Sequence, residues 1–276
     1  MSTNTIGSVT ARLKGGFGNQ LFQYASGRAL ASQLACPFFV DTQWFSKANS
    51  NRQYKLPSIG LNATNNDFTK GQRNSNKLAS KFSGSKKHLT EPSGNGYQPF
   101  SCQASQRIYL DGYWQSEKYF VDIRTQLLAD INLELIEKYR HATLFPSDQT
   151  VAVHIRRGDY ITQDSSQALS IEYVKNAMAE FGNNHDFMFF SDDINWCKET
   201  FAGNNITFAN NQSDLQDLKQ MSQAAHNIIA NSTFSWWSAW LNKNKNQRVI
   251  APRPWTIENT HKDILPERWQ TIAFDS

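Results

Sequence analysis

Three polar segments follow apolar runs of the chain, at points where strands of a sheet would end. The segment 154–159 reads His-Ile-Arg-Arg-Gly-Asp and overlaps the end of an apolar run. The segments 191–193 (Ser-Asp-Asp) and 231–233 (Asn-Ser-Thr) come directly after two further apolar runs. Ligands of open parallel sheets bind beyond the carboxyl ends of the strands. We therefore expect the three segments to share one rim and to form a site there.

Arg156 has the chemistry to bind a phosphate group. A guanidinium presents a rigid fork of N–H donors and keeps its charge at physiological pH. Successive side chains of an extended chain point to opposite faces, so Arg156 and Arg157 should serve different purposes. Because Arg156 shares a face with His154, we predict that Arg156 faces the ligand. Arg157 is then a supporting residue that pairs internally, with Asp159 as its candidate partner.

Ser232 and Thr233 stand where the next helix should begin. Their first interpretation is helix capping, in which a side-chain oxygen accepts from a free backbone N–H group. The same helix start offers free N–H groups and the positive end of a dipole to a phosphate. The two interpretations are compatible, and we predict both.

The acidic pair Asp192 and Asp193 suggests a divalent metal site. The preferred interpretation is that Asp193 caps the helix that follows and that Asp192 supports the rim. A pyrophosphate bound here would already have Arg156 and a helix N-terminus to balance its charge. We therefore expect neither a metal ion nor a cofactor.

Asp217 has two open interpretations. It falls on a predicted helix, opposite an apolar stripe. A carboxylate in such a place is ordinarily only solvated, but it can also accept from the neighbouring N–H donors on one edge of a purine base.

The composition indicates a folded globular protein. Of 276 residues, 39% are hydrophobic and 19% are charged, which excludes a disordered chain. The net charge of +4 and the pI of about 8.9 are too mild to imply a nucleic-acid partner. Three cysteines without paired spacing favour a reducing compartment. No apolar run reaches the ~20 residues of a membrane helix, so we expect a cytoplasmic protein.

The apolar runs predict an α/β fold in two domains, 1–140 and 141–276, each a Rossmann-like unit facing a cleft between them. Alternation of strands and helices after residue 146 favours a doubly wound parallel sheet. The expected strands there are 151–155, 187–190, 206–208, 227–230 and 248–251, and the expected helices are 171–181, 193–201, 213–225 and 233–241. In the first domain we expect strands at 9–13, 37–41 and 107–110 and helices at 20–34 and 116–130.

The segment 49–96 is rich in Asn, Ser, Lys and Gly and has few apolar residues. The preferred interpretation is a long solvated surface excursion. Its basic residues, concentrated at 70–87, leave an acceptor-facing or membrane-surface element as the alternative.

Five motifs, taken in order along nearly the whole chain, resemble those of the galactoside α-1,2-fucosyltransferases, glycosyltransferase family 11, of bacterial type. They are GGFGNQLFQYA at 15–25, DGYWQSEKYF at 111–120, VHIRRGDY at 153–160, FSDD at 190–193 and NSTFSWW at 231–237. The combination is specific, whereas each motif alone is less so.

The resemblance implies a GT-B-like fold and an inverting, metal-independent transfer of L-fucose from GDP-β-L-fucose to the 2-hydroxyl of galactose. It implies that His154 and Asp217 hold guanine and that Arg156 lies at the phosphates. The full set of donor-binding residues that it implies is Phe17, Gly18, Asn19, His154, Arg156, Asp217, Ser232, Thr233 and Phe234.

The acceptor is expected on the first domain, with Tyr113 and Trp114 as candidate sugar contacts. Asp159 and Asp164 are the candidates for a catalytic general base. The expected acceptor is a galactose-terminated oligosaccharide or lipid-linked glycan of a surface polysaccharide (O-antigen or capsule), reached at the inner face of the membrane. The alternatives are a fucosyltransferase of another linkage and a nucleotide-binding protein without catalytic activity.

Overall fold

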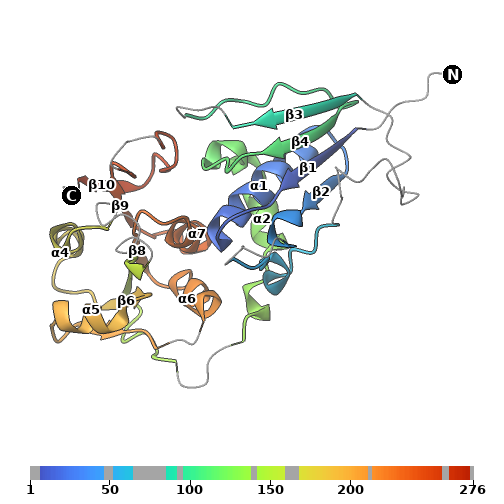
Figure 1. Cartoon of the computed structure of the whole chain (residues 1–276). Coiled ribbons are helices and arrows are strands. Elements are labelled where there is room, and N and C mark those ends of the chain that lie inside the picture. Colours follow the sequence, from blue (N-terminus) through green and yellow to red (C-terminus); the bar gives the residue numbers. More distant parts are fainter. Residues whose placement is uncertain are drawn as a thin grey trace. The chain divides into compact units, whose positions relative to one another are not determined.

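The computed structural model describes residues 7–46, 52–64, 85–91, 96–137, 142–158, 168–210, 213–256 and 261–273. The chain divides into two compact units, Met1–Leu135 and Ile136–Ser276. Each unit is built on its own sheet of parallel strands (Figure 1). The predicted α/β fold in two domains, each built on a parallel sheet, is confirmed. The sequence predicted the domain boundary after residue 140, and in the structure it lies after Leu135.

The first unit has four parallel strands in the order β2-β1-β4-β3. Its helix α1 (Phe17–Gln33) lies along β1 and β2 (Figure 1). The strands are β1 (Ser8–Arg12), β2 (Phe38–Asp41), β3 (Lys86–Thr90) and β4 (Arg107–Asp111). The remaining elements among the described residues are the short helix α2 (Arg124–Asp130) and the 3-10 turns η1 (Gln43–Ser46), η2 (Leu56–Ile59), η4 (Glu117–Tyr119), η5 (Val121–Ile123) and η6 (Leu133–Leu135).

Helix α1 begins earlier than predicted, at Phe17 rather than at residue 20. Gly15 has a φ of +80°, a left-handed conformation that glycine adopts without steric cost. This residue lets the chain leave β1 and turn directly into the helix, so the Gly-rich motif includes the first helical turn.

Two glutamines of the same motif stabilise the first unit. Gln20 is fully buried, accepts from the backbone N–H of Lys55 (3.0 Å) and donates to the carbonyl of Gln53 (2.8 Å). Gln23 is also fully buried and accepts from the backbone N–H of Lys14 (2.9 Å). These side chains hold the backbone before α1 and the distant segment 53–55 against the helix.

One sequence prediction for the first unit is wrong, and one strand of that unit was not predicted. The segment 116–130 is not one helix but two 3-10 turns followed by α2, because Ser116 caps a single turn and Phe120 (φ −144°) leaves helical geometry. The polar segment 49–96 includes a strand, β3, paired in parallel with β4. A polar sequence suits β3 because it is an edge strand with alternate exposed residues.

The second unit has six parallel strands in the order β10-β9-β8-β5-β6-β7. Every strand and helix predicted after residue 146 is present, and β10 is an addition. The strands are β5 (Val151–Ile155), β6 (Phe187–Ser191), β7 (Ile206–Phe208), β8 (His226–Ile228), β9 (Val249–Arg253) and β10 (Gln270–Ala273). The helices are α4 (Ile171–Ala179), α5 (Ile194–Thr200), α6 (Asp214–Met221) and α7 (Thr233–Leu241). None of the described helices has the length and hydropathy needed to cross a bilayer.

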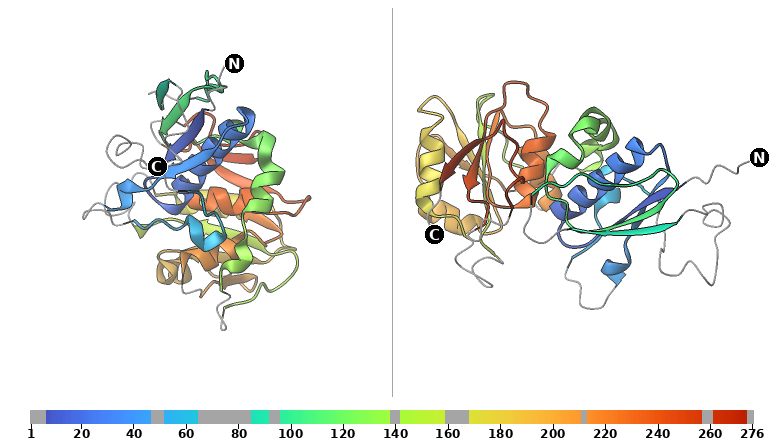
Figure 2. Two further views of the ribbon diagram at one scale, coloured as in Figure 1. Left: turned by 90° about the vertical axis from the view of Figure 1, so that its right-hand side faces the viewer. Right: turned by 90° about the horizontal axis from the view of Figure 1, so that it is seen from above.

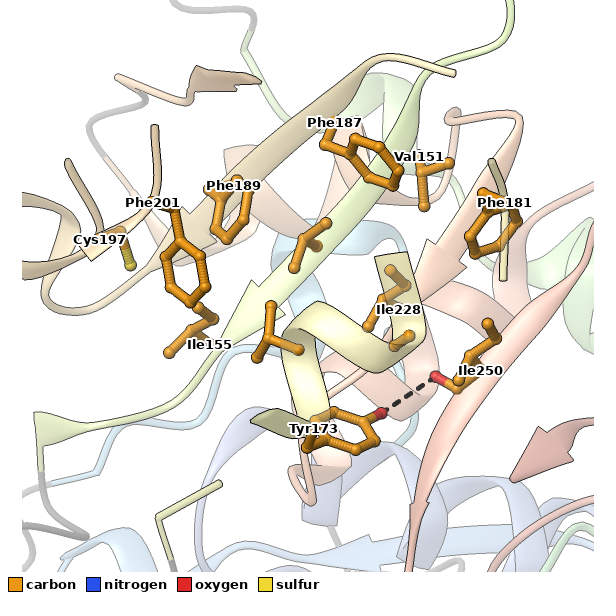
Figure 3. Packing of buried hydrophobic residues seen from close by; sticks show 13 residues of the cluster. Val151, Ile155, Tyr173, Phe181, Phe187, Phe189, Cys197, Phe201, Ile228 and Ile250 are labelled. Carbon is orange, nitrogen blue, oxygen red and sulfur yellow. Dashed lines mark hydrogen bonds between the residues drawn. The ribbon is translucent and has the colours of Figure 1, made fainter. Parts of the chain in front are cut away.

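The central strand β5 is buried on both faces, and its alternation decides which way each side chain points. Val151, Val153 and Ile155 pack in one cluster with α4 (Figure 3). Ala152 packs in the opposite cluster with residues next to or on α6 and α7. Figure 2 (right) shows α4 and α7 on opposite sides of this sheet. His154 follows the alternation of Ala152 and is therefore directed toward the α7 side.

Helix α7 is buried from Ser235 to Leu241, as expected of a helix enclosed by the rest of its unit. Trp236, Trp237 and Trp240 are each at most 1% exposed, and their rings contact one another. The indole N–H of Trp236 donates to the carbonyl of Ile264 at 2.7 Å. The body of α7 is thus part of the hydrophobic core.

Tyr173 of α4 joins the carboxyl end of β8 to the first residues of β9, and its loss should weaken the fold. Its buried hydroxyl donates to the carbonyl of Ile229 (2.8 Å) and lies 3.4 Å from that of Ile250 (Figure 3). Tyr173→Phe leaves a buried carbonyl without this donor and should lower the free energy of unfolding by about 1–3 kcal/mol. Urea denaturation measures this change in the free energy of unfolding. The matched variant Tyr113→Phe, at an exposed tyrosine, should change it by less than about 0.5 kcal/mol; equal effects would contradict the assignment.

Candidate functional site

The three polar segments lie at one edge of the second sheet. Strand β5 lies between β6 and β8, and all three strands are parallel. In the register, His154 is opposite Phe190 and Ile155 is opposite Ser191, while Val153 is opposite Ile228 of β8. The carboxyl ends of the three strands therefore adjoin, and the predicted common rim is confirmed.

The carboxylate of Asp192 organises the turn after β5. It accepts from the backbone N–H groups of Arg157 (2.9 Å) and Gly158 (3.1 Å). It also pairs with Nη1 of Arg156 at 2.9 Å. A Cβ atom at position 158 would lie 2.8 Å from Oδ2 of Asp192, so a larger residue there would displace this carboxylate. One carboxylate thus fixes both the backbone of the turn and the guanidinium of Arg156.

Arg157 is held by partners that the sequence did not identify. Its Nε donates to Oδ2 of Asp193 at 3.3 Å, and its guanidinium lies 3.6 Å from the ring centre of Trp196. A guanidinium over an indole face is a favourable cation–π contact. The arrangement fits the predicted supporting role. The predicted partner Asp159 lies outside the described residues, as does Asp164.

The capping predictions are confirmed at both helix starts. Asp193 accepts from the backbone N–H of Trp196 at 3.3 Å and caps α5. Ser232 accepts from the backbone N–H of Phe234 at 3.3 Å and caps α7. Phosphate binding at the start of α7 and independence of a metal ion stay predictions.

His154 is a buried, neutral side chain at the centre of the rim. It is 7% exposed, and its ring lies 5.6 Å from that of Phe234 between centroids. Burial lowers its pKa to about 4; the charge of Arg156 acts in the same direction and that of Asp192 against it. Its Nδ1 finds no hydrogen-bond partner among the residues that the structure describes. A buried ring nitrogen of this kind is suited to bond a ligand.

The remaining predicted donor residues are distributed over both units. Asp217 lies in the first turn of α6 and is half-buried. Phe17 and Gly18 are buried in α1, and Oδ1 of Asn19 accepts from Nε2 of Gln115 at 2.9 Å. Their contacts with a nucleotide sugar stay predictions.

The two aromatic candidates for the acceptor differ in exposure. Tyr113 is 38% exposed and can present its ring to a ligand. Trp114 is 3% exposed, and its ring packs on those of Phe100 and Tyr119. Trp114 is therefore a core residue in this structure, and its predicted contact with a sugar is not supported.

Comparison with known proteins confirms the resemblance seen in the motifs. The profile of Glycosyl transferase family 11 matches residues 1–273. An α-1,2-colitosyltransferase of Escherichia coli is 30% identical over 96% of this chain and 98% of its own length. A galactoside 2-alpha-L-fucosyltransferase of Caenorhabditis elegans is 25% identical over 96% of this chain and 79% of its own length. Among solved structures, the NodZ α-1,6-fucosyltransferase soaked with GDP-fucose aligns with a TM-score of 0.47 and 14% identity, over 92% and 96% of the two chains.

Proposed function

The chain belongs to glycosyltransferase family 11, and on this premise we propose that it transfers L-fucose from GDP-β-L-fucose to the 2-hydroxyl of a terminal galactoside, with inversion. The proposal rests on two side chains at one edge of the second sheet. Arg156 is held by Asp192, and His154 is buried and neutral. The α-1,2 linkage is supported by the names of the relatives. The acceptor would be the end of a surface glycan.

In this reaction the galactose O2 attacks the anomeric carbon of fucose while GDP departs. The transition state is oxocarbenium-like, and negative charge grows on the β-phosphate. Arg156 stabilises this charge, together with the free N–H groups at the start of α7. Because Asp192 already holds the guanidinium, Arg156 needs little rearrangement as the charge develops.

The guanine base would be read by His154 and Asp217. A neutral imidazole has one donor and one acceptor nitrogen, and a carboxylate accepts from two neighbouring N–H groups of guanine. The low pKa of His154, caused by burial, keeps the imidazole neutral at the pH of the reaction.

GDP-colitose is a second candidate donor, because one relative is named as a colitosyltransferase. Colitose is L-fucose without its 3-hydroxyl group, so a site for one sugar closely matches the other in shape. Initial rates with GDP-fucose and GDP-colitose, each with the same galactoside, decide between them. We expect GDP-fucose to have the higher kcat/KM, and a higher value for GDP-colitose would reassign the donor.

The central test uses the full chain, GDP-fucose and a panel of β-galactosides. We expect release of GDP in equal amount to a product whose fucose C1 is joined to O2 of galactose, as read by NMR. Another product linkage would indicate the alternative fucosyltransferase. Stabilisation by GDP without consumption of either donor would indicate a binding protein without catalytic activity.

We also propose that Asp159 or Asp164 acts as the general base that takes the proton from the galactose 2-hydroxyl. The variant that removes the base should lose the acidic limb of the kcat/KM–pH profile. Profiles measured for Asp159→Asn and Asp164→Asn would exclude both residues if each matched that of the unmodified enzyme.

A further inference from the structure

A second polar cluster lies at the carboxyl edge of the first sheet. Asp111 ends β4, and the neighbouring β1 ends at Arg12, followed by Lys14. Oδ2 of Asp111 lies 2.6 Å from Nη1 of Arg12, and Oδ1 lies 3.0 Å from Nζ of Lys14. The three side chains are 17–31% exposed, so they are accessible to solvent and are not part of the core. We call Arg12, Lys14 and Asp111 the β1–β4 cluster.

The ionisation of Asp111 follows from its two partners. Burial alone would raise its pKa, but the hydrogen bonds and charges of Lys14 and Arg12 bring the pKa below its ordinary value. The carboxylate is therefore charged and accepts hydrogen bonds only. The cluster offers one fixed acceptor group with cationic donors on both sides of it.

Buried groups fix the surroundings of the β1–β4 cluster. The backbone N–H of Lys14 is held by Gln23, which is fully buried. At the next strand, Asp41 ends β2 and accepts from the hydroxyl of Tyr109 at 2.6 Å. The cluster is thus anchored on the sheet.

The turn after β4 is strained and firmly held. Trp114 has a φ of +54°, a left-handed conformation that is uncommon for an aromatic residue. The carboxylate of Glu91 accepts from the backbone N–H groups of both Tyr113 (2.7 Å) and Trp114 (2.9 Å). At Gly112, a Cβ atom would lie 2.6 Å from Cβ of Glu91, so this close approach requires glycine. Strain of this kind persists only where the surroundings enforce it, and it concentrates at ligand sites.

The strained turn places Tyr113 beside the β1–β4 cluster. Nζ of Lys14 lies 5.0 Å from the centre of the Tyr113 ring, and Tyr113 is 38% exposed. A hexose ring has hydroxyl groups that both donate and accept, and a C–H face that packs on an aromatic ring. A carboxylate between two cationic donors, next to an exposed tyrosine, meets each of these requirements.

We propose that Asp111, Lys14, Arg12 and Tyr113 bind the neutral hexose ring of the acceptor, and that Glu91 is a positioning residue that holds Tyr113 in place. The inference rests on the proposed function, since it names the site of the acceptor in that reaction. The support for it is that the strained turn, whose two backbone N–H groups are bound by Glu91, holds an exposed tyrosine next to the ion-pair network.

The test separates acceptor binding from donor use. Asp111→Asn and Lys14→Met are compared with the unmodified enzyme for the KM of a β-galactoside, the KM of GDP-fucose, and the slow hydrolysis of GDP-fucose by water. We expect the acceptor KM to rise about tenfold or more, because Lys14→Met removes a donor to a hydroxyl group and Asp111→Asn replaces one charged acceptor oxygen with an NH₂ donor. The KM of GDP-fucose and the rate of its hydrolysis by water should stay within about twofold of the values for the unmodified enzyme. Asp122→Asn, at an exposed aspartate of the same unit, is the matched control and should change none of them.

Glu91 is tested by partial rescue. Glu91→Ala removes both backbone contacts and should raise the acceptor KM in the same way as Asp111→Asn. Glu91→Gln keeps one carbonyl oxygen that can accept from one of the two N–H groups, so its acceptor KM should lie between those of Glu91→Ala and the unmodified enzyme. A purely structural residue would change the melting temperature without this graded change in acceptor KM.

Two results would overturn the inference alone. One is an unchanged acceptor KM in active Asp111→Asn and Lys14→Met enzymes. The other is a parallel loss of donor hydrolysis and a raised KM of GDP-fucose, which would assign the cluster to the donor phosphates. An unmodified enzyme that consumes no GDP-sugar with any galactoside would instead overturn the proposed function, and the acceptor site with it.

Discussion

Replacing Arg156 by alanine is expected to lower kcat of fucosyl transfer by about 10²–10³-fold, the usual cost of losing a preorganised contact to developing charge. The guanidinium is held by Asp192 at 2.9 Å before any ligand binds. Its main contribution therefore falls in the transition state, where the departing β-phosphate carries the most charge. Steady-state kinetics with saturating GDP-fucose and galactoside measure the effect, and circular dichroism with the melting temperature checks the fold.

The matched control for this variant is Arg248→Ala. Arg248 precedes β9, at the amino edge of the same sheet, where its guanidinium lies 4.7 Å from the centre of the Phe181 ring and donates to the carbonyl of Glu180 at 3.1 Å. This variant should keep kcat within about twofold, because Arg248 is remote from the charge that develops in the transition state. Near-normal kcat in folded Arg156→Ala enzyme would defeat the assignment of Arg156, and an equal loss in both variants would point to the fold instead.

His154 should make the protein less stable in acid by about 3 kcal/mol, since its pKa falls from 6.5 in the unfolded chain to about 4 in the folded one. Between these two pH values the unfolded chain binds a proton that the folded chain does not. The free energy of unfolding therefore falls as the pH is lowered through this window, and the contribution of His154 levels off below it.

Urea denaturation at several pH values between about 4 and 7 measures this effect, with His154→Gln as the comparison. The variant cannot take up the proton, so its stability should fall less steeply with pH than that of the unmodified protein. His88→Gln, at an exposed histidine of β3, should keep the steep dependence. Parallel curves for His154→Gln and the unmodified protein would show that His154 does not titrate in this way.

The centre of the second unit could be predicted from the sequence because β5 and β6 are buried on both faces and therefore form largely apolar runs. Continuing the alternation of β5 beyond Ile155 also predicted correctly that Arg156 and Arg157 have different partners. The caps Asp193 and Ser232 were local signals, since each bonds within three residues of itself. Sequence spacing carries this kind of information directly.

The first unit was less predictable, because its contacts connect distant parts of the chain. Strand β3 has an edge position, so its polar sequence gave no apolar run to detect. The pair formed by Arg12 and Asp111 spans 99 residues, and nothing in the local sequence indicates it.

In the second unit, the contact of Trp196 with Arg157 could have been predicted. Trp196 lies one helical turn after Asp193, so both side chains lie beside the same arginine.

The burial of α7 has a consequence for the rate of the reaction. Its first turn faces the rim, while Trp236, Trp237 and Trp240 fix its body in the core. The amide dipoles at the start of the helix are then oriented when the protein folds, not when the substrate arrives. In the proposed reaction, charge would develop on the leaving group in a field that is already in place, and little reorganisation energy would be added to the barrier of each turnover.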